Sequence, residues 1–192
     1  CHIFTGLYQG MCVAICEGLR YIQKNLKESR ATVMLGVPLV FESMHKKVWK
    51  QAEASGKADT MRRMVKLSKK LKLYNKPKVV RSIFSQLHHS IGGHMALFIA
   101  GGAAINPEVI RDYEAMGIPM IQGYGMTENA PIIAVNRDQY SKADSVGKPM
   151  PGTEVRIANP DKDGIGEIIC RGPSVMIGYY DDPEATAEVL KN

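Results

Sequence analysis

The chain has 192 residues, and its 45% hydrophobic and 23% charged residues are the proportions of an ordinary soluble globular protein. No apolar run is long enough to span a bilayer and no secretory signal pattern opens the sequence, which argues against a membrane-spanning protein. The formal net charge of +6 lies in one segment, because residues 42–81 carry 13 Lys and Arg against 3 Asp and Glu. No nucleic-acid-binding module accompanies this charge, so we expect no nucleic-acid partner.

The first residue is Cys1 rather than methionine, and it opens an apolar stretch with near-helical spacing. We therefore expect the chain to be a piece of a longer protein. The four cysteines, Cys1, Cys12, Cys16 and Cys170, show neither a CxxC pair nor the Cys and His spacing of a zinc site. We expect buried free thiols, which indicates a reducing, cytoplasmic location.

The first half of the chain predicts helices around one short strand. Residues 3–27 have near-helical apolar spacing broken by glycines, and the apolar run 31–38 ends at a proline and predicts a buried strand. Residues 39–53, 57–73 and 77–92 predict three further helices. In the helix 57–73, one face is apolar and the other is basic. The apolar face comprises Met61, Met64, Val65, Ser68 and Leu71, and the basic face comprises Arg62, Arg63, Lys66, Lys69 and Lys70.

The second half predicts a strand, a helix and a second strand in close succession. The apolar strand 95–101 runs into a glycine turn, after which Asn106 suits the helix N-cap and Pro107 the first helical position. Gly117 suits the position after the last helical turn, and the strand 118–124 follows. This βαβ spacing predicts parallel strands, with ligands bound beyond their carboxyl ends.

The pattern changes near residue 140, where proline and glycine interrupt the chain. Residues 153–158 and 166–171 predict a hairpin around the turn residues NPDKDG, and Asp182 with Pro183 begins a final helix that runs to the end. The fold class is therefore α/β: a parallel βαβ sheet with helices over residues 1–140, followed over residues 141–192 by the start of a small β subdomain.

Two glycine turns at the ends of the neighbouring strands carry the candidate site. Gly101 and Gly102 permit a ligand to approach the backbone closely, although a tight turn without a ligand also explains them. In the second turn, Tyr124 can stack on a purine or belong to the core, and Thr127 can donate to a phosphate or cap a helix. Glu128 can complete a Mg²⁺ shell with phosphate oxygens, or it can be a solvated surface charge.

Four segments together resemble the adenylate-forming superfamily of acyl-CoA synthetases, nonribosomal-peptide adenylation domains and luciferases. They are QGYGMTEN (122–129), GGAAINPEV (101–109), SVGKPMPGTEVRI (145–157) and GEIICRGPSVMIGYYDDPEAT (166–186). The likeness covers most of residues 95–192, and the combination of four ordered motifs is highly specific. Upstream, VPLVFESMHKKVW (37–49) resembles the long-chain fatty-acid branch with weaker specificity.

The resemblance implies roles for particular residues. Thr127 would contact the phosphate of ATP or of the adenylate and Glu128 would hold Mg²⁺, so these two are the expected catalytic residues and Glu128 the expected metal ligand. Tyr124 would stack on adenine. Cofactor binding would fall to Gly101, Gly102, Ala103, Ala104, Gln122, Gly123, Tyr124, Gly125, Met126 and Thr127. Within that set, Gly102, Ala103 and Ala104 would bound the adenine pocket, and Gly123 and Gly125 would line the junction where the acyl carboxylate meets the α-phosphate.

The implied activity is ATP-dependent activation of a long-chain fatty acid to acyl-adenylate and then to acyl-CoA, with coenzyme A as co-substrate. The alternatives are an adenylate-forming enzyme for an aryl or amino acid, and a noncatalytic nucleotide-binding module. The family's glycine-rich phosphate loop, its ribose-binding aspartate and its C-terminal catalytic lysine have no counterpart in this sequence. We therefore expect the chain by itself to be inactive and to work within a full-length parent.

The basic segment 42–81 has two explanations. Solvated helix faces account for it, with lysine stems covering apolar surface. Alternatively, the segment attracts an anionic membrane surface or the phosphates of coenzyme A, which would give peripheral membrane association. His88, His89 and His94 show no third-ligand pattern, so we expect structural roles for them.

Overall fold

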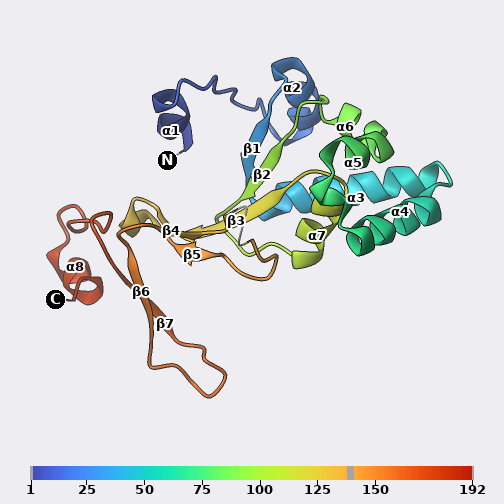
Figure 1. The fold of residues 1–192 in the computed structure, drawn as a ribbon. Helices are drawn as coiled ribbons and strands as arrows, with labels where there is room; N and C mark the ends of the chain where they lie inside the picture. The colour runs from blue at the N-terminus through green and yellow to red at the C-terminus, as the bar shows by residue number, and fades with distance from the viewer. Residues whose placement is uncertain (1, 138–140, 192) are drawn as a thin grey trace.

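The computed structural model describes residues 2–137 and 141–191 (Figure 1). The helices within residues 38–115 lie mainly to one side of the parallel part of a five-stranded sheet, and a two-stranded hairpin projects from this body beside the C-terminal helix. The strands are β1 (Val33–Gly36), β2 (Leu97–Ala100), β3 (Met120–Gly125), β4 (Ile132–Val135), β5 (Lys148–Pro149), β6 (Glu154–Ala158) and β7 (Glu167–Arg171). The α-helices are α1 (His2–Tyr8), α2 (Ile22–Ser29), α3 (Pro38–Ala54), α4 (Ala58–Leu71), α5 (Pro77–Ile83), α6 (Ser85–Ser90), α7 (Pro107–Ala115) and α8 (Pro183–Val189). Short 3₁₀ turns are η1 (Leu19–Tyr21), η2 (Leu73–Asn75) and η3 (Thr127–Asn129).

The larger sheet has the order β1-β2-β3-β4-β5 and is parallel over its first three strands. Helix α7 connects β2 to β3, and β4 and β5 then add to the sheet in antiparallel orientation. Strands β6 and β7 form the separate hairpin. The α/β fold, the parallel βαβ unit and the C-terminal hairpin are therefore confirmed. The boundary near residue 140 stays a prediction, with β5 lying beyond it in the larger sheet.

An aromatic cluster joins the sheet to the helices that cover it. The rings of Phe98 on β2, Phe41 on α3 and Tyr113 on α7 are all buried, with centroids 5.0 Å apart for Phe41 and Phe98 and 5.1 Å for Phe98 and Tyr113. The Tyr113 hydroxyl donates to the Phe41 carbonyl oxygen at 3.1 Å, so the polar tip of this buried ring is satisfied. Burial raises the pKa of the Tyr113 hydroxyl, which therefore stays a neutral donor.

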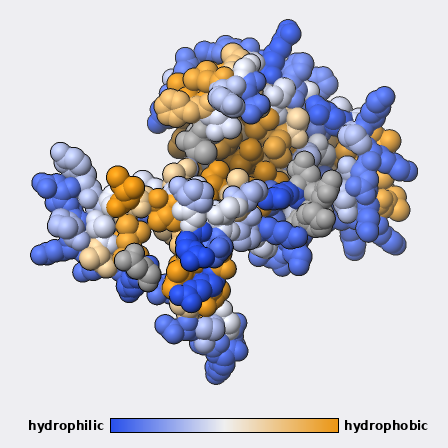
Figure 2. Space-filling view, turned by 60° about the vertical axis from the view of Figure 1, so that its left-hand side comes forward, coloured by the Kyte–Doolittle hydropathy of each residue, from blue (hydrophilic) through white to orange (hydrophobic). Residues whose placement is uncertain are grey.

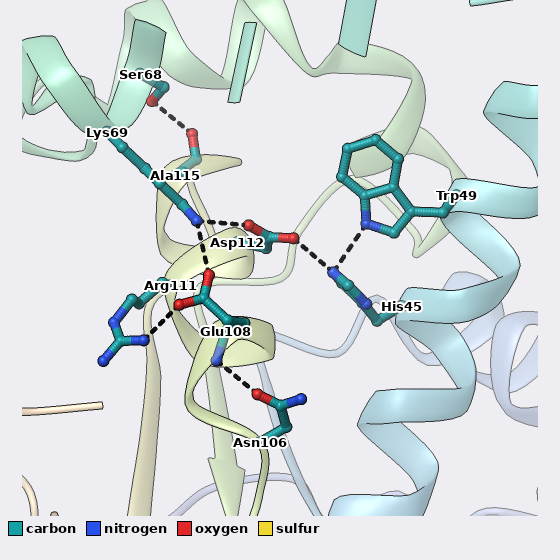
Figure 3. Close-up of polar contacts among 9 residues, drawn as sticks. All are labelled: His45, Trp49, Ser68, Lys69, Asn106, Glu108, Arg111, Asp112 and Ala115. Carbon is teal, nitrogen blue, oxygen red and sulfur yellow. Dashed lines mark hydrogen bonds and ion pairs between the residues drawn. The ribbon is translucent and has the colours of Figure 1, made fainter. Parts of the chain in front are cut away.

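A polar network links α3, α4 and α7 at the edge of the same core (Figure 3). The Asp112 carboxylate lies 2.8 Å from Lys69 Nζ and 2.8 Å from His45 Nε2, and the Trp49 indole nitrogen lies 2.9 Å from the same His45 nitrogen. Burial by itself raises the pKa of the Asp112 carboxyl, but the hydrogen bonds from His45 and Lys69 outweigh burial and hold that pKa below its ordinary value. A single ring nitrogen cannot both accept from the indole and donate to the carboxylate, so the two His45 contacts compete.

The helix signals of the second half are also confirmed. The Asn106 side chain accepts a hydrogen bond from the backbone N–H of Glu108 at 2.9 Å, and Pro107 is the first residue of α7. Gly117 follows that helix with φ +83°, a conformation that favours glycine. The Asp182 side chain caps α8 in the same way, through the Ala185 N–H at 3.0 Å. This helix ends at Val189, however, and does not run to the end of the chain as expected, because the backbone is extended at Leu190.

Several expectations for the first half are wrong in detail. Residues 3–27 form α1 and α2 separated by irregular chain, and Cys12 and Cys16 are exposed in that connection instead of buried. Gly10 (φ +71°) and Gly18 (φ +146°) interrupt the helical path, so the thiols never reach a packed face. Both are free thiols, as is the half-buried Cys170, while Cys1 lies outside the described residues.

Three further elements differ from expectation. The strand predicted at 31–38 is β1, which lies at the edge of the sheet and is half exposed instead of buried. The helix predicted at 77–92 is divided into α5 and α6 at Phe84. Leu71 was placed on the apolar face of α4 but is 56% exposed, because the helix ends there and the chain turns away at Lys72 with φ +50°.

Two surfaces are plain in the space-filling view (Figure 2). Hydrophobic atoms gather in the middle of the upper body, whereas the lower end of the hairpin projection is hydrophilic. The hydrophilic end matches the turn residues NPDKDG between β6 and β7. Among residues 2–137 and 141–191, no helix combines the length and the apolar character needed to cross a membrane.

His88 is structural, as expected, and its burial gives the fold a pH dependence. Its Nε2 lies 2.9 Å from the Met116 carbonyl oxygen and therefore carries a proton, while its Nδ1 is buried without a hydrogen-bond partner among the described residues. Burial lowers the pKa of this imidazole, and the nearby Arg81 and His89 lower it further, against the opposing effect of the Met116 hydrogen bond.

We expect the free energy of unfolding to fall as the pH falls below about 6.5, because the unfolded chain then binds a proton at His88 that the folded chain does not. The variant His88→Gln keeps an N–H for the Met116 carbonyl but does not titrate, so its stability should fall less over the same interval. Urea unfolding between about pH 7.5 and pH 5 measures both slopes. Equal slopes for the two proteins would contradict this role of His88.

Candidate functional site

The parallel strands bring the two predicted motifs to one edge of the sheet. Gly36 on β1 is in register with Ala100 on β2, and Ala100 is in register with Gln122 on β3. One residue further along, Gly101 follows the last residue of β2 and lies beside Gly123, which is still within β3. This adjacency is the one expected for ligand binding beyond the carboxyl ends of parallel strands.

The first motif presents its backbone openly at this edge. The Gly101 N–H donates to the Gly36 carbonyl oxygen at 3.2 Å, and Gly102 has φ +86°, which a side chain would strain. Ala103 and Ala104 are exposed. A Cβ atom added to Gly101 would meet nothing within 4 Å, so the space in front of this residue is open to a ligand.

The second motif is a strand where a glycine-spaced turn was expected. Gly123, Tyr124 and Gly125 belong to β3 and pair with β4, with a shift of register between Tyr124 and Gly125. A Cβ atom on Gly125 would collide with the Pro131 carbonyl oxygen, and that same oxygen accepts from the Met126 N–H at 2.8 Å. Glycine is needed at Gly125 because the returning chain passes directly over it.

Tyr124 lies in the middle of this strand and is half-buried. Within the described part of the chain, its hydroxyl group makes no hydrogen bond, unlike that of the core residue Tyr113. A partly exposed ring without a polar anchor fits a stacking role better than a core role.

Gln122 and Asn136 fix the loop beyond the sheet, a function the sequence did not reveal. The Gln122 side-chain nitrogen donates to the carbonyl oxygens of Ala143 at 2.9 Å and Ser145 at 3.1 Å, and Gln122 is buried. The Asn136 side chain donates to Ser145 at 2.6 Å and accepts from the Lys142 N–H at 3.1 Å. In this structure the Gln122 amide therefore holds protein backbone and does not face open space.

Glu128 is held by the segment that follows the hairpin. The Tyr179 hydroxyl donates to Glu128 Oε1 at 2.7 Å, and the Met176 N–H donates to the Glu128 carbonyl oxygen at 2.8 Å. The bond from Tyr179 holds the pKa of the Glu128 carboxyl below its ordinary value, which favours the ionised form. Thr127 precedes Glu128 in η3 and is exposed. Tyr179 belongs to the motif GYY, and no role in the candidate site was expected for it from the sequence. Its contact with Glu128 spans 51 positions, so no spacing in the sequence predicts it.

The residues present fit a magnesium ion held with a phosphate ligand. The described residues contain no group of three or more His, Cys, Asp or Glu side chains that could form a protein cage for a metal. Mg²⁺ commonly takes only one or two carboxylates and completes its shell with phosphate oxygens and water. A single ionised carboxylate at Glu128 matches that second arrangement.

A parallel α/β sheet with open glycine backbone, a half-exposed tyrosine and a threonine–glutamate pair at one edge has the features of a nucleotide-binding α/β protein. Comparison with known proteins gives the family. The model of the AMP-binding enzyme family matches residues 1–180, and the chain belongs to this family.

Curated relatives of this chain are named as ligases and synthases of more than one kind. A long-chain-fatty-acid–acyl-carrier-protein ligase of Arabidopsis thaliana is 28% identical over 90% of this chain and 30% of its own length. A long-chain-fatty-acid–CoA ligase of Homo sapiens is 31% identical over 86% of this chain and 27% of its own. A feruloyl-CoA synthase of an Amycolatopsis species is 41% identical over 49% of this chain and 21% of its own. The chain therefore spans less than a third of the length of these relatives.

Solved structures of the same class share the fold. The o-succinylbenzoate CoA synthetase of Bacillus subtilis matches all of this chain and 33% of its own length, with a TM-score of 0.66 at 18% identity. This likeness establishes an arrangement of elements typical of adenylate-forming enzymes.

Two glycines of the site give a matched pair of variants. Gly125→Ala places a methyl group against the Pro131 carbonyl, so we expect a loss of about 1–3 kcal/mol in the free energy of unfolding. Gly101→Ala points a methyl group into open space and should leave stability nearly unchanged. Urea unfolding compares the two, and equal losses in both variants would contradict the close approach at Gly125.

Proposed function

We propose that this chain is part of an ATP-dependent long-chain-fatty-acid–CoA ligase that forms an acyl-adenylate. The observation that carries the proposal is the register of β2 and β3, which starts the segments 101–104 and 122–129 side by side. Family membership and the two long-chain-fatty-acid ligases among the relatives support it. Since those relatives are more than three times as long, the activity is proposed for a full-length protein.

The proposed reaction has two steps. An oxygen of the fatty carboxylate attacks the α-phosphorus of ATP, the bond to the β-phosphate breaks, and pyrophosphate leaves with its electron pair. The coenzyme A sulfur then attacks the acyl carbon of the mixed anhydride, forming the thioester and releasing AMP. The first step brings two anions together, so fixed donors and a cation have to offset their repulsion.

The residues at the sheet edge suit that first step in different ways. Gly101 and Gly102 leave room for adenine against the backbone, and the Tyr124 ring offers a stacking face. The Thr127 hydroxyl can donate to a phosphate oxygen. Glu128 is the one carboxylate of the motif, and a magnesium ion held there with the phosphates would neutralise charge developing on the leaving group.

The rival substrate is an aryl or amino acid, and a feruloyl-CoA synthase is among the relatives. The rival acceptor is a carrier protein, as in the name of the Arabidopsis relative. A noncatalytic nucleotide-binding module is the rival from another class. Pyrophosphate release by the full-length protein with ATP and Mg²⁺, compared for palmitate, ferulate and amino acids, separates these possibilities. Release that depends on palmitate supports the proposal, whereas nucleotide binding without release supports the module.

A cytoplasmic location is part of the same proposal, and fatty acid, ATP and coenzyme A are the proposed partners. The exposed Cys12 and Cys16 are free thiols, which agrees with a reducing compartment.

Glu128→Gln tests the metal role most directly. The variant keeps the shape of the side chain and an oxygen that can accept from Tyr179, but it removes the negative charge. We expect fatty-acid-dependent pyrophosphate release to fall on the order of 100-fold. The concentration of Mg²⁺ needed for half-maximal release should also rise.

The matched control is Glu167→Gln, which removes an exposed carboxylate from the hairpin. Its release rate and its Mg²⁺ requirement should both equal those of the unchanged protein. A Glu128→Gln protein with normal rate and normal Mg²⁺ requirement would refute the role of Glu128.

A further inference from the structure

The solvent-facing side of α4 carries basic and apolar side chains in one stripe. Arg63, Lys66, Leu67, Lys70 and Leu71 follow the spacing i, i+3, i+4, i+7 and i+8, which places them on one face of the helix. We call these five residues the α4 outer face. Leu67 is 51% exposed and Leu71 is 56% exposed, so both leucines stand in solvent among the cations.

The cations of α4 divide into two groups by their partners. Beside the outer face, Arg62 pairs with Asp59 at 3.0 Å, and Lys69 pairs with Asp112 at 2.8 Å. In contrast, Arg63, Lys66 and Lys70 form no ion pair within the described ranges. The positive charge of the α4 outer face is therefore uncompensated by the residues that the structure describes.

Exposed basic side chains and an exposed aromatic ring continue in the sequence past the end of α4. Lys72, Lys76 and Lys78 are exposed, and Tyr74 between them is 45% exposed. A tyrosine with an apolar ring and a polar tip is a side chain typical of the boundary between water and lipid. Exposed cations and an exposed tyrosine thus follow the α4 outer face directly in the sequence.

This combination limits what can cover the surface. Another part of the protein that covered it with apolar side chains would bury three unpaired cations, which is strongly unfavourable. An acidic protein would satisfy the cations but has no general reason to accept two solvated leucines. The headgroup layer of an anionic bilayer satisfies both, because phosphates lie directly above the first acyl carbons.

We propose that the α4 outer face docks on an anionic lipid bilayer. Arg63, Lys66 and Lys70 lie against the headgroup phosphates, while Leu67 and Leu71 enter the interfacial layer. The proposal does not depend on the ligase activity, and either can fail without the other.

The test is co-sedimentation of the full-length protein with vesicles of phosphatidylcholine, with and without about 30% phosphatidylserine. We expect binding only to the anionic vesicles, with a fall between about 50 and 300 mM salt. The variant Arg63→Gln/Lys66→Gln/Lys70→Gln should bind on the order of 100-fold more weakly. The variant Leu67→Ser/Leu71→Ser should also bind more weakly at low salt, by at least about tenfold.

The matched control removes three exposed cations from other elements, in the variant Lys27→Gln/Arg156→Gln/Lys162→Gln. It has the same net charge as the first variant and should bind within about twofold of the unchanged protein. All substituted side chains are exposed, so unchanged far-UV circular dichroism and melting temperature verify the fold of each variant.

Three results would overturn the proposal. The first is binding that ignores anionic lipid, and the second is a control variant that loses as much affinity as the outer-face variant. The third is unchanged binding of the leucine variant. Binding of polyglutamate in the absence of vesicle binding would instead assign the surface to an acidic protein.

Discussion

The parallel pairing of β2 with β3 is the constraint on which the rest of the site depends. It sets Ala100 opposite Gln122, and from that register Gly101 and Gly123 follow side by side. Successive side chains of a strand point to opposite faces, so a slip of one residue would turn Gln122 away from the loop that it holds and Tyr124 with it. The aromatic contacts among Phe41, Phe98 and Tyr113 oppose such a slip, because they fix α3, β2 and α7 in one core.

The charged side chains of α4 differ in whether they have an ion-pair partner among the described residues. Lys69 has one and lies where helices pack together, whereas Arg63 and Lys70 have none among those residues and face solvent. Where α3, α4 and α7 meet, Lys69, Asp112 and His45 are close enough to satisfy one another, and the network holds three helices together (Figure 3). Burial raises the free energy of each charge, so such groups occur in pairs. On the outer face of the same helix, Arg63 and Lys70 stay in solvent, where an unpaired charge costs little. The same basic helix therefore serves the core on one side and remains available on the other.

The features that the sequence predicted most accurately are helix ends with capping residues, which depend on residues close together in the chain. Asn106, Pro107 and Gly117 mark both ends of α7, and each acts through backbone geometry within a few residues. The sequence predicted least accurately which side chains are buried, because burial depends on residues far apart in the chain. The helical spacing around Cys12 and Cys16 was real, but the glycines on either side break the helix, and both thiols are exposed. Leu71 fits the apolar period of α4, yet the helix stops before a neighbour can cover it.

The contact between Glu128 and Tyr179 shows how the two parts of the chain are coupled. These residues are 51 positions apart, and the hairpin β6–β7 lies between them in the sequence. Tyr179 is fixed in turn by its backbone N–H, which donates to the Thr186 hydroxyl on α8 at 2.9 Å, and that hydroxyl donates to the Asp182 carbonyl at 2.7 Å. A carboxylate that accepts a hydrogen bond from a fixed phenol has fewer orientations to lose when it takes up a cation. The segment after the hairpin is therefore part of the proposed site, because it orients the carboxylate on which the proposed metal binding depends.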